Sequence, residues 1–174
     1  MSRAFVKEDA NNLPEELPER QVSTLPNYVT PRGRADLESR LARLIETRRT
    51  LIAAKSDDPL QGAQLRLAER DLRYYEARLK SAILIDNSGS GTGEVRFGAV
   101  VTVKDDAGTE QEFTIVGEDE ADATTRKISW ASPLASALLG ASLGSRVSLA
   151  RGGTGGTPLE ITAVRYPERS DPKV

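Results

Sequence analysis

The chain has 174 residues, of which 38% are apolar and 29% charged, and its net charge at pH 7 is −2. This length holds one ordinary domain or two small ones, since a domain uses roughly 100 to 200 residues. A net charge near zero gives no general attraction to nucleic acid. Cys and His are both absent, which excludes disulfides, thiolate nucleophiles, zinc sites built on Cys or His, and Ser-His triads.

Hydropathy and local charge narrow the class of protein further. No stretch approaches the roughly 20 apolar residues that span a bilayer, and the N-terminus has no apolar signal segment. We therefore expect a cytoplasmic protein that makes no membrane contact. The charge is unevenly distributed, because residues 31–85 carry 12 basic and 8 acidic side chains whereas the flanks are acidic.

The first 30 residues combine prolines and acidic side chains with few apolar anchors, and we predict that residues 1–30 form a flexible N-terminal tail. A helix is predicted to begin at Pro31, because Thr30 can cap exposed N–H groups and Pro suits the first helical position. The last residues, 169–174, are predicted to form a polar tail.

Two amphipathic stripes predict an antiparallel helical hairpin, a coiled coil, over residues 31–86. The polar stretch 56–59 separates them, and Arg48 occupies a seam position where its stem can still pack. A first arm of about 26 residues would extend roughly 39 Å, too long to be buried in a domain this small, so it should project. The first stripe comprises Leu37, Leu41, Leu44 and Leu51, and the second comprises Leu65, Ala68, Leu72, Tyr75, Leu79 and Ala82.

The rest of the chain changes to a strand-like pattern. Residues 87–93 are rich in Gly and Ser, which predicts a linker, and residues 94–168 predict a small antiparallel β domain with one short helix. The fold class is therefore α+β, a helical hairpin followed by a sheet domain. Strands are predicted at 95–103, 112–116, 127–130, 147–150 and 159–166, and the helix at 133–139.

Several segments between residues 28 and 166 carry a resemblance to a known family. The most specific stretch is Ile128-Ser129-Trp130-Ala131-Ser132-Pro133-Leu134-Ala135. With this stretch, and with a helical hairpin followed by a β-rich domain, the chain resembles the GreA/GreB family of bacterial transcription elongation factors, which assist transcript cleavage. It is more similar to GreB than to GreA. The other matching segments are Tyr28-Val29-Thr30, Ala82 to Asp86, Phe97 to Val101, and Phe113 to Gly117 followed by the acidic run 118–122.

The resemblance implies that residues 94–168 have an FKBP-like fold and dock at the mouth of the secondary channel of bacterial RNA polymerase. It assigns docking to Ser132 and Pro133, with Trp130 as a neighbour, although Trp130 is equally interpreted as a core aromatic. Ala131 stands where GreB has an acidic residue, so an ion pair made there would be missing. The chain would act as a monomer and contact nascent RNA only indirectly.

Asp57 and Asp58 lie in the predicted turn between the two helices. The resemblance implies that such tip carboxylates reach the polymerase active site, share its Mg²⁺ and orient a water molecule. Mg²⁺ prefers hard oxygen ligands, and neighbouring carboxylates are costly unless a cation offsets them. The chain would then have no catalytic residue and no tightly bound cofactor of its own. The alternative interpretation is that the Asp-Asp-Pro turn merely caps the second helix.

The tip departs from the family pattern. The family reads Asp and then Glu-Asn-Ala, whereas residues 56–63 read Ser-Asp-Asp-Pro-Leu-Gln-Gly-Ala. The hairpin is also shorter than the family's by one to two turns, about 5 to 11 Å. Two functions therefore stay open: a factor that stimulates cleavage of backtracked RNA, and a non-cleaving competitor of Gre factors for the secondary channel.

Five arginines on the hairpin are candidates for contact with nucleic acid or with acidic polymerase surfaces. The alternative is an ordinary solvated helix face with intrahelical ion pairs. The five are Arg48, Arg49, Arg66, Arg70 and Arg73.

Other classes of function have weaker support. An FKBP-like isomerase or chaperone needs an aromatic pocket, and only 5% of the residues are aromatic, while a fold alone confers no activity. A purely structural dimerisation hairpin is a third alternative. The Gly-rich runs 89–93 and 152–156 lack the Gly-Lys-Ser/Thr of a phosphate loop, and residues 118–122 are interpreted as a solvated acidic loop.

Overall fold

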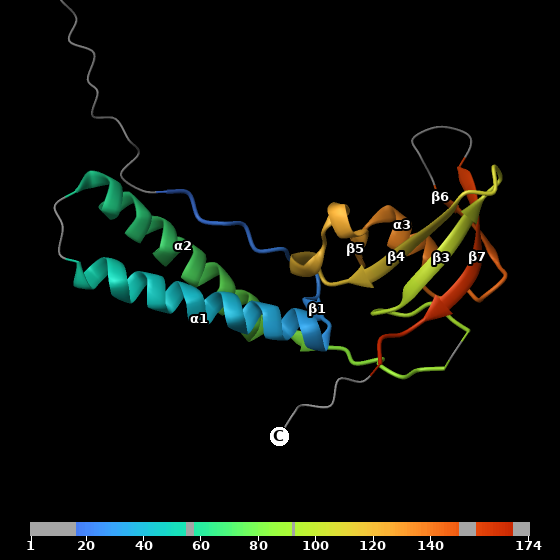
Figure 1. The fold of residues 1–174 in the computed structure, drawn as a ribbon, viewed down its shortest axis with the longest axis horizontal. Helices are drawn as coiled ribbons and strands as arrows, with labels where there is room; N and C mark the ends of the chain where they lie inside the picture. The colour runs from blue at the N-terminus through green and yellow to red at the C-terminus, as the bar shows by residue number, and fades with distance from the viewer. Residues whose placement is uncertain (1–16, 55–57, 92, 150–155, 169–174) are drawn as a thin grey trace, which may run out of the picture.

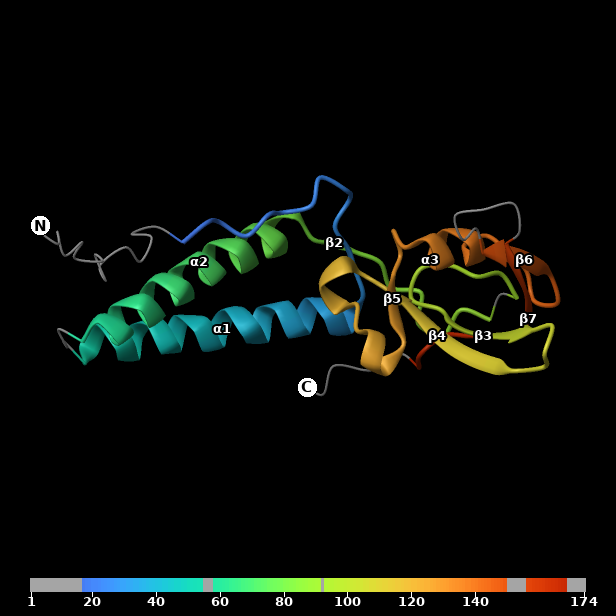
Figure 2. The same cartoon turned by 90° about the horizontal axis from the view of Figure 1, so that it is seen from above.

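The molecule consists of a two-helix finger that projects from a small sheet domain (Figure 1). The structure, a computed structural model, describes residues 17–54, 58–91, 93–149 and 156–168. Helix α1 (Pro31–Ala53) and helix α2 (Pro59–Ser81) form the finger, and seen from above they still extend away from the sheet (Figure 2). The predicted α+β class and the projecting hairpin are confirmed.

Local capping fixes where both helices begin. The Thr30 hydroxyl oxygen accepts the Gly33 N–H at 2.9 Å, and Pro31 takes the first helical position. The Asp58 carboxylate accepts the Leu60 N–H at 2.9 Å. Each helix has 23 residues, so the finger is about 35 Å long, slightly shorter than expected from the stripe.

The predicted stripes form the seam between the helices. Leu37 is 2% exposed, and Ala68 and Leu72 are also buried. The rest of the seam is half-buried, because two helices alone cannot enclose their apolar faces. Arg48 extends from the seam and pairs with Glu69 of the opposite helix at 3.2 Å.

A short parallel strand pair closes the base of the finger. Strand β1 (Tyr28–Val29) precedes α1, and strand β2 (Ile83–Leu84) follows α2. The Ile83 N–H donates to the Asn27 carbonyl at 2.8 Å. The pairing fixes the entrance and the exit of the hairpin side by side.

The N-terminal segment differs from the flexible tail predicted for residues 1–30. Residues 17–27 lie alongside α2 in both views (Figure 1, Figure 2). Glu19 pairs with Arg73, and the guanidinium of Arg20 lies 3.8 Å from the centroid of the Tyr74 ring. The segment has few apolar anchors, as predicted, but ion pairs and a cation–π contact hold it instead. Residues 1–16 lie outside the described part of the chain.

The sheet domain contains five strands in the order β5-β4-β3-β7-β6. Neighbouring strands are antiparallel except β4 and β5, which pair in parallel. The predicted antiparallel sheet is confirmed for the other pairs, and only the edge strand β5 differs. The two 3₁₀ turns between β4 and β5 carry the chain back along the sheet, so that β5 runs in the same direction as β4. The strands are β3 (Val100–Asp105), β4 (Glu110–Val116), β5 (Lys127–Ser129), β6 (Arg146–Leu149) and β7 (Thr157–Arg165), with turns η1 (Glu118–Glu120) and η2 (Ala123–Thr125) and helix α3 (Pro133–Leu138).

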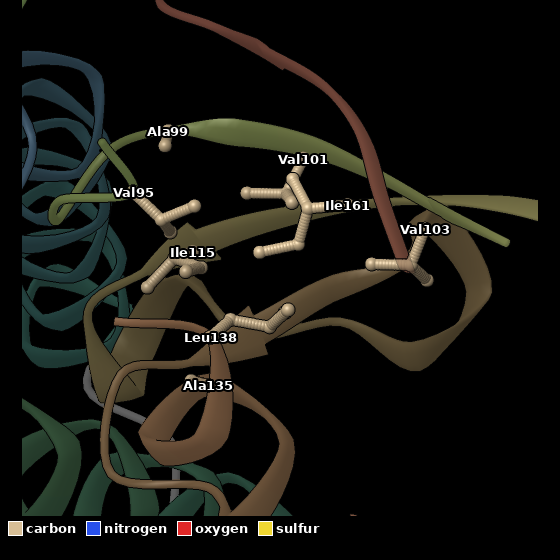
Figure 3. Packing of buried hydrophobic residues seen from close by; sticks show 8 residues of the cluster. All are labelled: Val95, Ala99, Val101, Val103, Ile115, Ala135, Leu138 and Ile161. Carbon is tan, nitrogen blue, oxygen red and sulfur yellow. The ribbon is translucent and has the colours of Figure 1, made fainter. Parts of the chain in front are cut away.

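The core of this domain lies between the sheet and α3 (Figure 3). Ile115 and Ile161 of the sheet and Leu138 of the helix have no exposed surface. Burying a side chain of this size contributes about 1.5 to 3 kcal/mol. The whole cluster is Val95, Ala99, Val101, Val103, Ile115, Ala135, Leu138 and Ile161.

The predicted linker is held at several points. The Asn87 side-chain amide donates to the Phe97 carbonyl at 3.0 Å, and the Gly89 N–H donates to the Pro167 carbonyl at 3.2 Å. None of the helices in the described ranges is both long and apolar enough to cross a membrane.

Candidate functional site

The tip of the finger is its end farthest from the sheet domain (Figure 1). Asp58 lies there at the start of α2, where its carboxylate caps the helix. The structure shows the helix cap at Asp58, and the metal role stays a prediction, since an N-cap carboxylate can also contact a partner. Asp57 lies outside the described residues.

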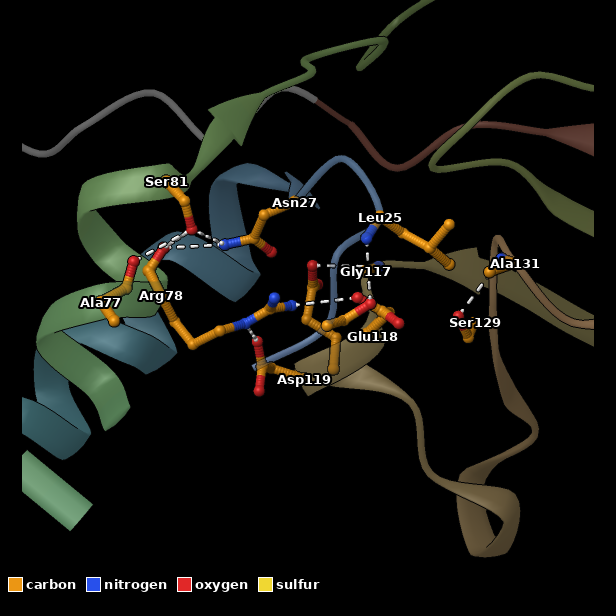
Figure 4. Close-up of polar contacts among 12 residues, drawn as sticks. Leu25, Asn27, Ala77, Arg78, Ser81, Gly117, Glu118, Asp119, Ser129 and Ala131 are labelled. Atoms are coloured by element: carbon orange, nitrogen blue, oxygen red, sulfur yellow. Dashed lines mark hydrogen bonds and ion pairs between the residues drawn. The ribbon is translucent and has the colours of Figure 1, made fainter. Parts of the chain in front are cut away.

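The finger joins the sheet domain through a buried arginine. Arg78 of α2 is only 1% exposed, and its Nε donates to the Asp119 carboxylate (Figure 4). Its Nη2 lies 3.3 Å from Glu118 Oε2. Two carboxylates facing one guanidinium replace the water that the buried charge has lost.

Tyr74 adds a second contact to the same carboxylate. It lies one turn before Arg78 on α2, and its hydroxyl donates to Asp119 Oδ1 at 2.6 Å. Burial and this hydrogen bond to a carboxylate raise the pKa of Tyr74 to about 12. Both oxygens of Asp119 are thus engaged by α2.

Glu120 ties the other helix to the same turn. Its carboxylate accepts the Thr30 N–H at 3.0 Å and also the Thr30 hydroxyl, just where α1 begins. A Cβ at Gly33 would overlap this carboxyl group, so glycine is required for the close approach. Successive residues of η1 therefore hold both helices of the finger.

An aromatic contact completes the junction. The Tyr28 ring of β1 lies 4.9 Å from the Trp130 ring and 6.1 Å from the Phe97 ring, in edge-to-face geometry. Trp130 also packs against the core of the sheet domain. In the free chain, Trp130 is therefore packed as a core aromatic residue, which is one of the two interpretations that the sequence left open.

The predicted docking loop is ordered by helix capping. The Ser132 hydroxyl accepts the Ala135 N–H at 3.2 Å, and Pro133 occupies the first turn of α3. Pro133 and Ala131 are exposed, whereas Ser132 is half-buried. The loop thus presents Pro133 to the surroundings in a fixed position.

Within the part of the chain that the structure describes, ion pairs engage four of the five candidate arginines. Arg48 pairs with Glu69 across the helices, while the other pairs are local or involve the N-terminal segment. These pairs agree with a solvated helix face, but exposed pairs are weak and a partner can replace them. The remaining pairs are Arg49 with Glu46, Arg70 with Asp71, and Arg73 with Glu19.

The interpretation of residues 118–122 as a solvated loop is wrong for residues 118–120, whereas Ala121 and Asp122 are exposed. Glu118, Asp119 and Glu120 form the junction that fixes the finger to the sheet domain. One signal was present in the sequence: Arg78 lies at the edge of the apolar stripe, three residues after Tyr75 and four before Ala82. A charge at that place requires a partner of opposite sign.

These features define a class of two-part protein in which a rigid helical finger is fixed to a separate sheet domain. The family model "Transcription elongation factor, GreA/GreB, C-term" matches residues 90–166. The GreB of Neisseria meningitidis serogroup B is 35% identical over 154 residues, which cover 80% of this chain and 94% of the relative. The GreA of Hyphomonas neptunium is 36% identical over 152 residues, covering 79% and 96%.

The chain therefore belongs to the GreA/GreB family of transcription elongation factors. Among solved structures it is similar to the GreA/GreB factor of Nitrosomonas europaea, with 22% identity and a TM-score of 0.40, covering 82% of this chain and 99% of that one.

The raised pKa of Tyr74 predicts a pH dependence of stability. Its pKa in the unfolded chain has the ordinary value near 10, so between pH 10 and about 12 only the unfolded chain releases this proton. The stability that the hydroxyl contributes is complete below pH 10 and is lost as the pH rises to about 12. We expect urea midpoints of wild type and Tyr74→Phe to converge over this range. Parallel curves would contradict the assignment.

Proposed function

We propose that this chain binds RNA polymerase at its secondary channel and extends the finger toward the active site, where it assists cleavage of backtracked RNA. The observation that carries the proposal is the finger itself, about 35 Å long, fixed on a separate domain by the buried Arg78. A projecting rod with a buried joint is suited to delivering a tip at a defined distance.

The tip supplies carboxylates and no complete catalytic centre. Asp58 is oriented by its cap on α2, and Asp57 precedes it in the sequence. Mg²⁺ bound in the polymerase would activate a water molecule and stabilise negative charge on the phosphate. Two carboxylates cannot fill the octahedral coordination of Mg²⁺, so in this proposal the polymerase and water supply the remaining ligands. The chemistry then belongs to the polymerase, and the chain is an accessory factor.

The sheet domain, residues 94–168, provides the anchor in this proposal. Pro133 is exposed at the start of α3, and the Ser132 cap holds its backbone. A rigid exposed proline loses little conformational freedom when a partner binds it. We therefore assign docking to the loop around Ser132 and Pro133, with Trp130 as its neighbour in the sequence.

A second candidate function is occupancy of the channel without cleavage. The observation that favours it is the finger's length of two 23-residue helices, because a tip that stops even a few ångströms short cannot position a reacting water. Such a protein would compete with cleavage factors for the same channel. Docking would be identical in the two cases, so binding and cleavage must be measured separately.

Docking is tested by Pro133→Ala in competition with a cleavage-stimulating Gre factor for core polymerase. Loss of an interface anchor is expected to weaken binding about five- to tenfold. Alanine is tolerated at the first helical position, so the thermal midpoint should change little. The matched control is Pro158→Ala, an exposed proline on β7, which should bind like wild type. Failure of wild type to co-migrate with core polymerase would overturn the proposal.

A further inference from the structure

The function proposed above leaves the N-terminal segment unexplained. We define the arm as residues 17–26, which lie along α2 (Figure 2). Its first residues and α2 line a groove of ≈ 490 Å³. On the helix side this groove, called the α2 groove here, is formed by Arg66, Glu69, Arg70 and Arg73.

Two consecutive charged residues of the arm, first an acidic and then a basic one, contact residues of opposite charge on α2. Glu19 accepts from Arg73 Nε at 3.0 Å. The next residue, Arg20, lies 3.6 Å from Asp71 and places its guanidinium on the Tyr74 ring. The helix therefore contacts an extended segment in which a carboxylate is followed by a cation, with Arg73 facing the carboxylate, and Tyr74 and Asp71 facing the cation, although Asp71 also pairs with Arg70.

The arm is held lightly. None of residues 17–26 is buried, and the side chains of Arg73 and Glu19 are 57% and 61% exposed. Exposed ion pairs contribute little to stability and weaken further with salt. Asn27, where the arm ends, is buried and its amide donates to the Arg78 carbonyl at 2.7 Å. The arm can thus leave α2 while its attachment at the base stays in place.

We propose that the α2 groove, together with the adjoining Asp71 and Tyr74, is a binding site for an extended segment of a partner protein that carries a carboxylate followed by a cation, and that the arm occupies this site in the free chain. The site lies on the finger, which enters the partner in the proposed function, and to that extent the inference rests on that function. Binding of the partner's segment displaces the arm, so the arm lowers the affinity of the finger for the partner.

A protein segment fits this groove better than a nucleic acid. Carboxylates of Glu69 and Asp71 lie among the arginines, and a phosphate backbone would be repelled by both. A phosphate chain also has no cation to replace Arg20 at Asp71 and on the Tyr74 ring. A segment of mixed charge matches both signs, as the arm does.

The test uses a full-length variant with a charge-reversed arm, Glu19→Lys with Arg20→Glu. Both new charges face like charges on α2, so the arm should leave the groove while its length is unchanged. The probe is a fluorescent peptide of residues 13–24, measured by anisotropy. We expect binding to the variant at least tenfold tighter than to wild type, because the wild-type arm competes at a high effective concentration.

Three controls make the result decisive. A peptide with the same two residues reversed should not bind the variant. Adding Asp71→Arg and Arg73→Glu to the variant should restore the closed arm and reduce binding of the wild-type peptide again. A single-stranded RNA 12-mer should bind more weakly than the peptide. Equal binding of the peptide to wild type and variant, or tighter binding of the RNA, would overturn the inference.

Binding to core polymerase links the site to the proposed function. The charge-reversed variant should bind core polymerase about three- to tenfold more tightly than wild type. In the variant the arm no longer occupies the site, so a larger fraction of the molecules can bind. If the arm is only a structural strap, reversal lowers the thermal midpoint and leaves both affinities unchanged, which contradicts the inference. If no form binds polymerase, the proposed function fails, while the peptide measurement still decides the site.

Discussion

Arg78→Met is expected to remove about 3 to 5 kcal/mol from the free energy that holds the finger on the sheet domain. Removing one partner of a buried ion pair costs this much because the remaining charge stays buried without compensation. The Asp119 side chain is 9% exposed and would keep only the Tyr74 hydroxyl. Met matches the arginine stem in volume, so lost packing contributes little.

Urea unfolding of Arg78→Met, followed with two probes, would distinguish loss of the junction from unfolding of the helices. Trp130 lies at the junction and reports on the sheet domain and its contact with Tyr28, whereas far-ultraviolet circular dichroism follows the helices. We expect the fluorescence transition to shift to lower urea before the helices unfold. The matched control is Arg43→Met, an exposed arginine on α1, which should change stability by less than about 0.5 kcal/mol. A wild-type midpoint for Arg78→Met would contradict the assigned role.

The junction matters because the finger acts as a lever. A tilt of about 5° at the base of a rod about 35 Å long moves its tip by about 3 Å. A misplacement of about 1 Å at a reacting group can already reduce a rate about 100-fold. Arg78 and Glu120 therefore control the position of the tip although they lie at the opposite end of the finger.

The finger could be predicted from the sequence because its determinants are local. Leu37 and Leu72 belong to stripes with steps of three and four residues, and only a helix places such steps on one face. Thr30 and Pro31 mark a helix start by their chemistry alone. The structure reproduces each of these features.

The junction could not be predicted in the same way. The partners of Arg78 lie 40 and 41 residues later, in a turn whose acidic composition is also typical of a solvated loop. The parallel pairing of β5 with β4 was missed for a similar reason, since alternation of apolar residues predicts a strand but not its neighbour. The arm was missed because charges rather than apolar side chains hold it.

The docking loop could be predicted from the sequence only in part. Ser132 and Pro133 predict the start of α3 locally, and the structure shows that helix. Their role toward a partner rests on the family resemblance and stays a prediction, as does that of Asp57. For Trp130 the sequence left two interpretations, and only the contact with Tyr28, 102 positions earlier in the chain, shows how the ring packs.

Cleavage of backtracked RNA by stalled polymerase is expected to fall by roughly 100-fold or more with Asp57→Asn/Asp58→Asn, compared with the wild-type factor. Asn keeps the size of Asp but removes the negative charge that a Mg²⁺ ligand supplies. Asn is also a good N-cap, so α2 should keep its start and the finger its length. Binding to polymerase, measured by competition, is therefore expected to stay at the wild-type level.

The matched control for the tip is Asp105→Asn/Asp106→Asn, a neighbouring aspartate pair at the end of β3 and the start of the turn that follows it. It removes the same two charges far from the finger and should leave cleavage unchanged. Unchanged cleavage by the tip variant would remove the carboxylates from the mechanism. A wild-type chain that competes for polymerase but gives no cleavage would instead establish the second candidate function. In that case Asp57→Asn/Asp58→Asn does not change cleavage, because a finger too short to reach the metal cannot supply it with a ligand.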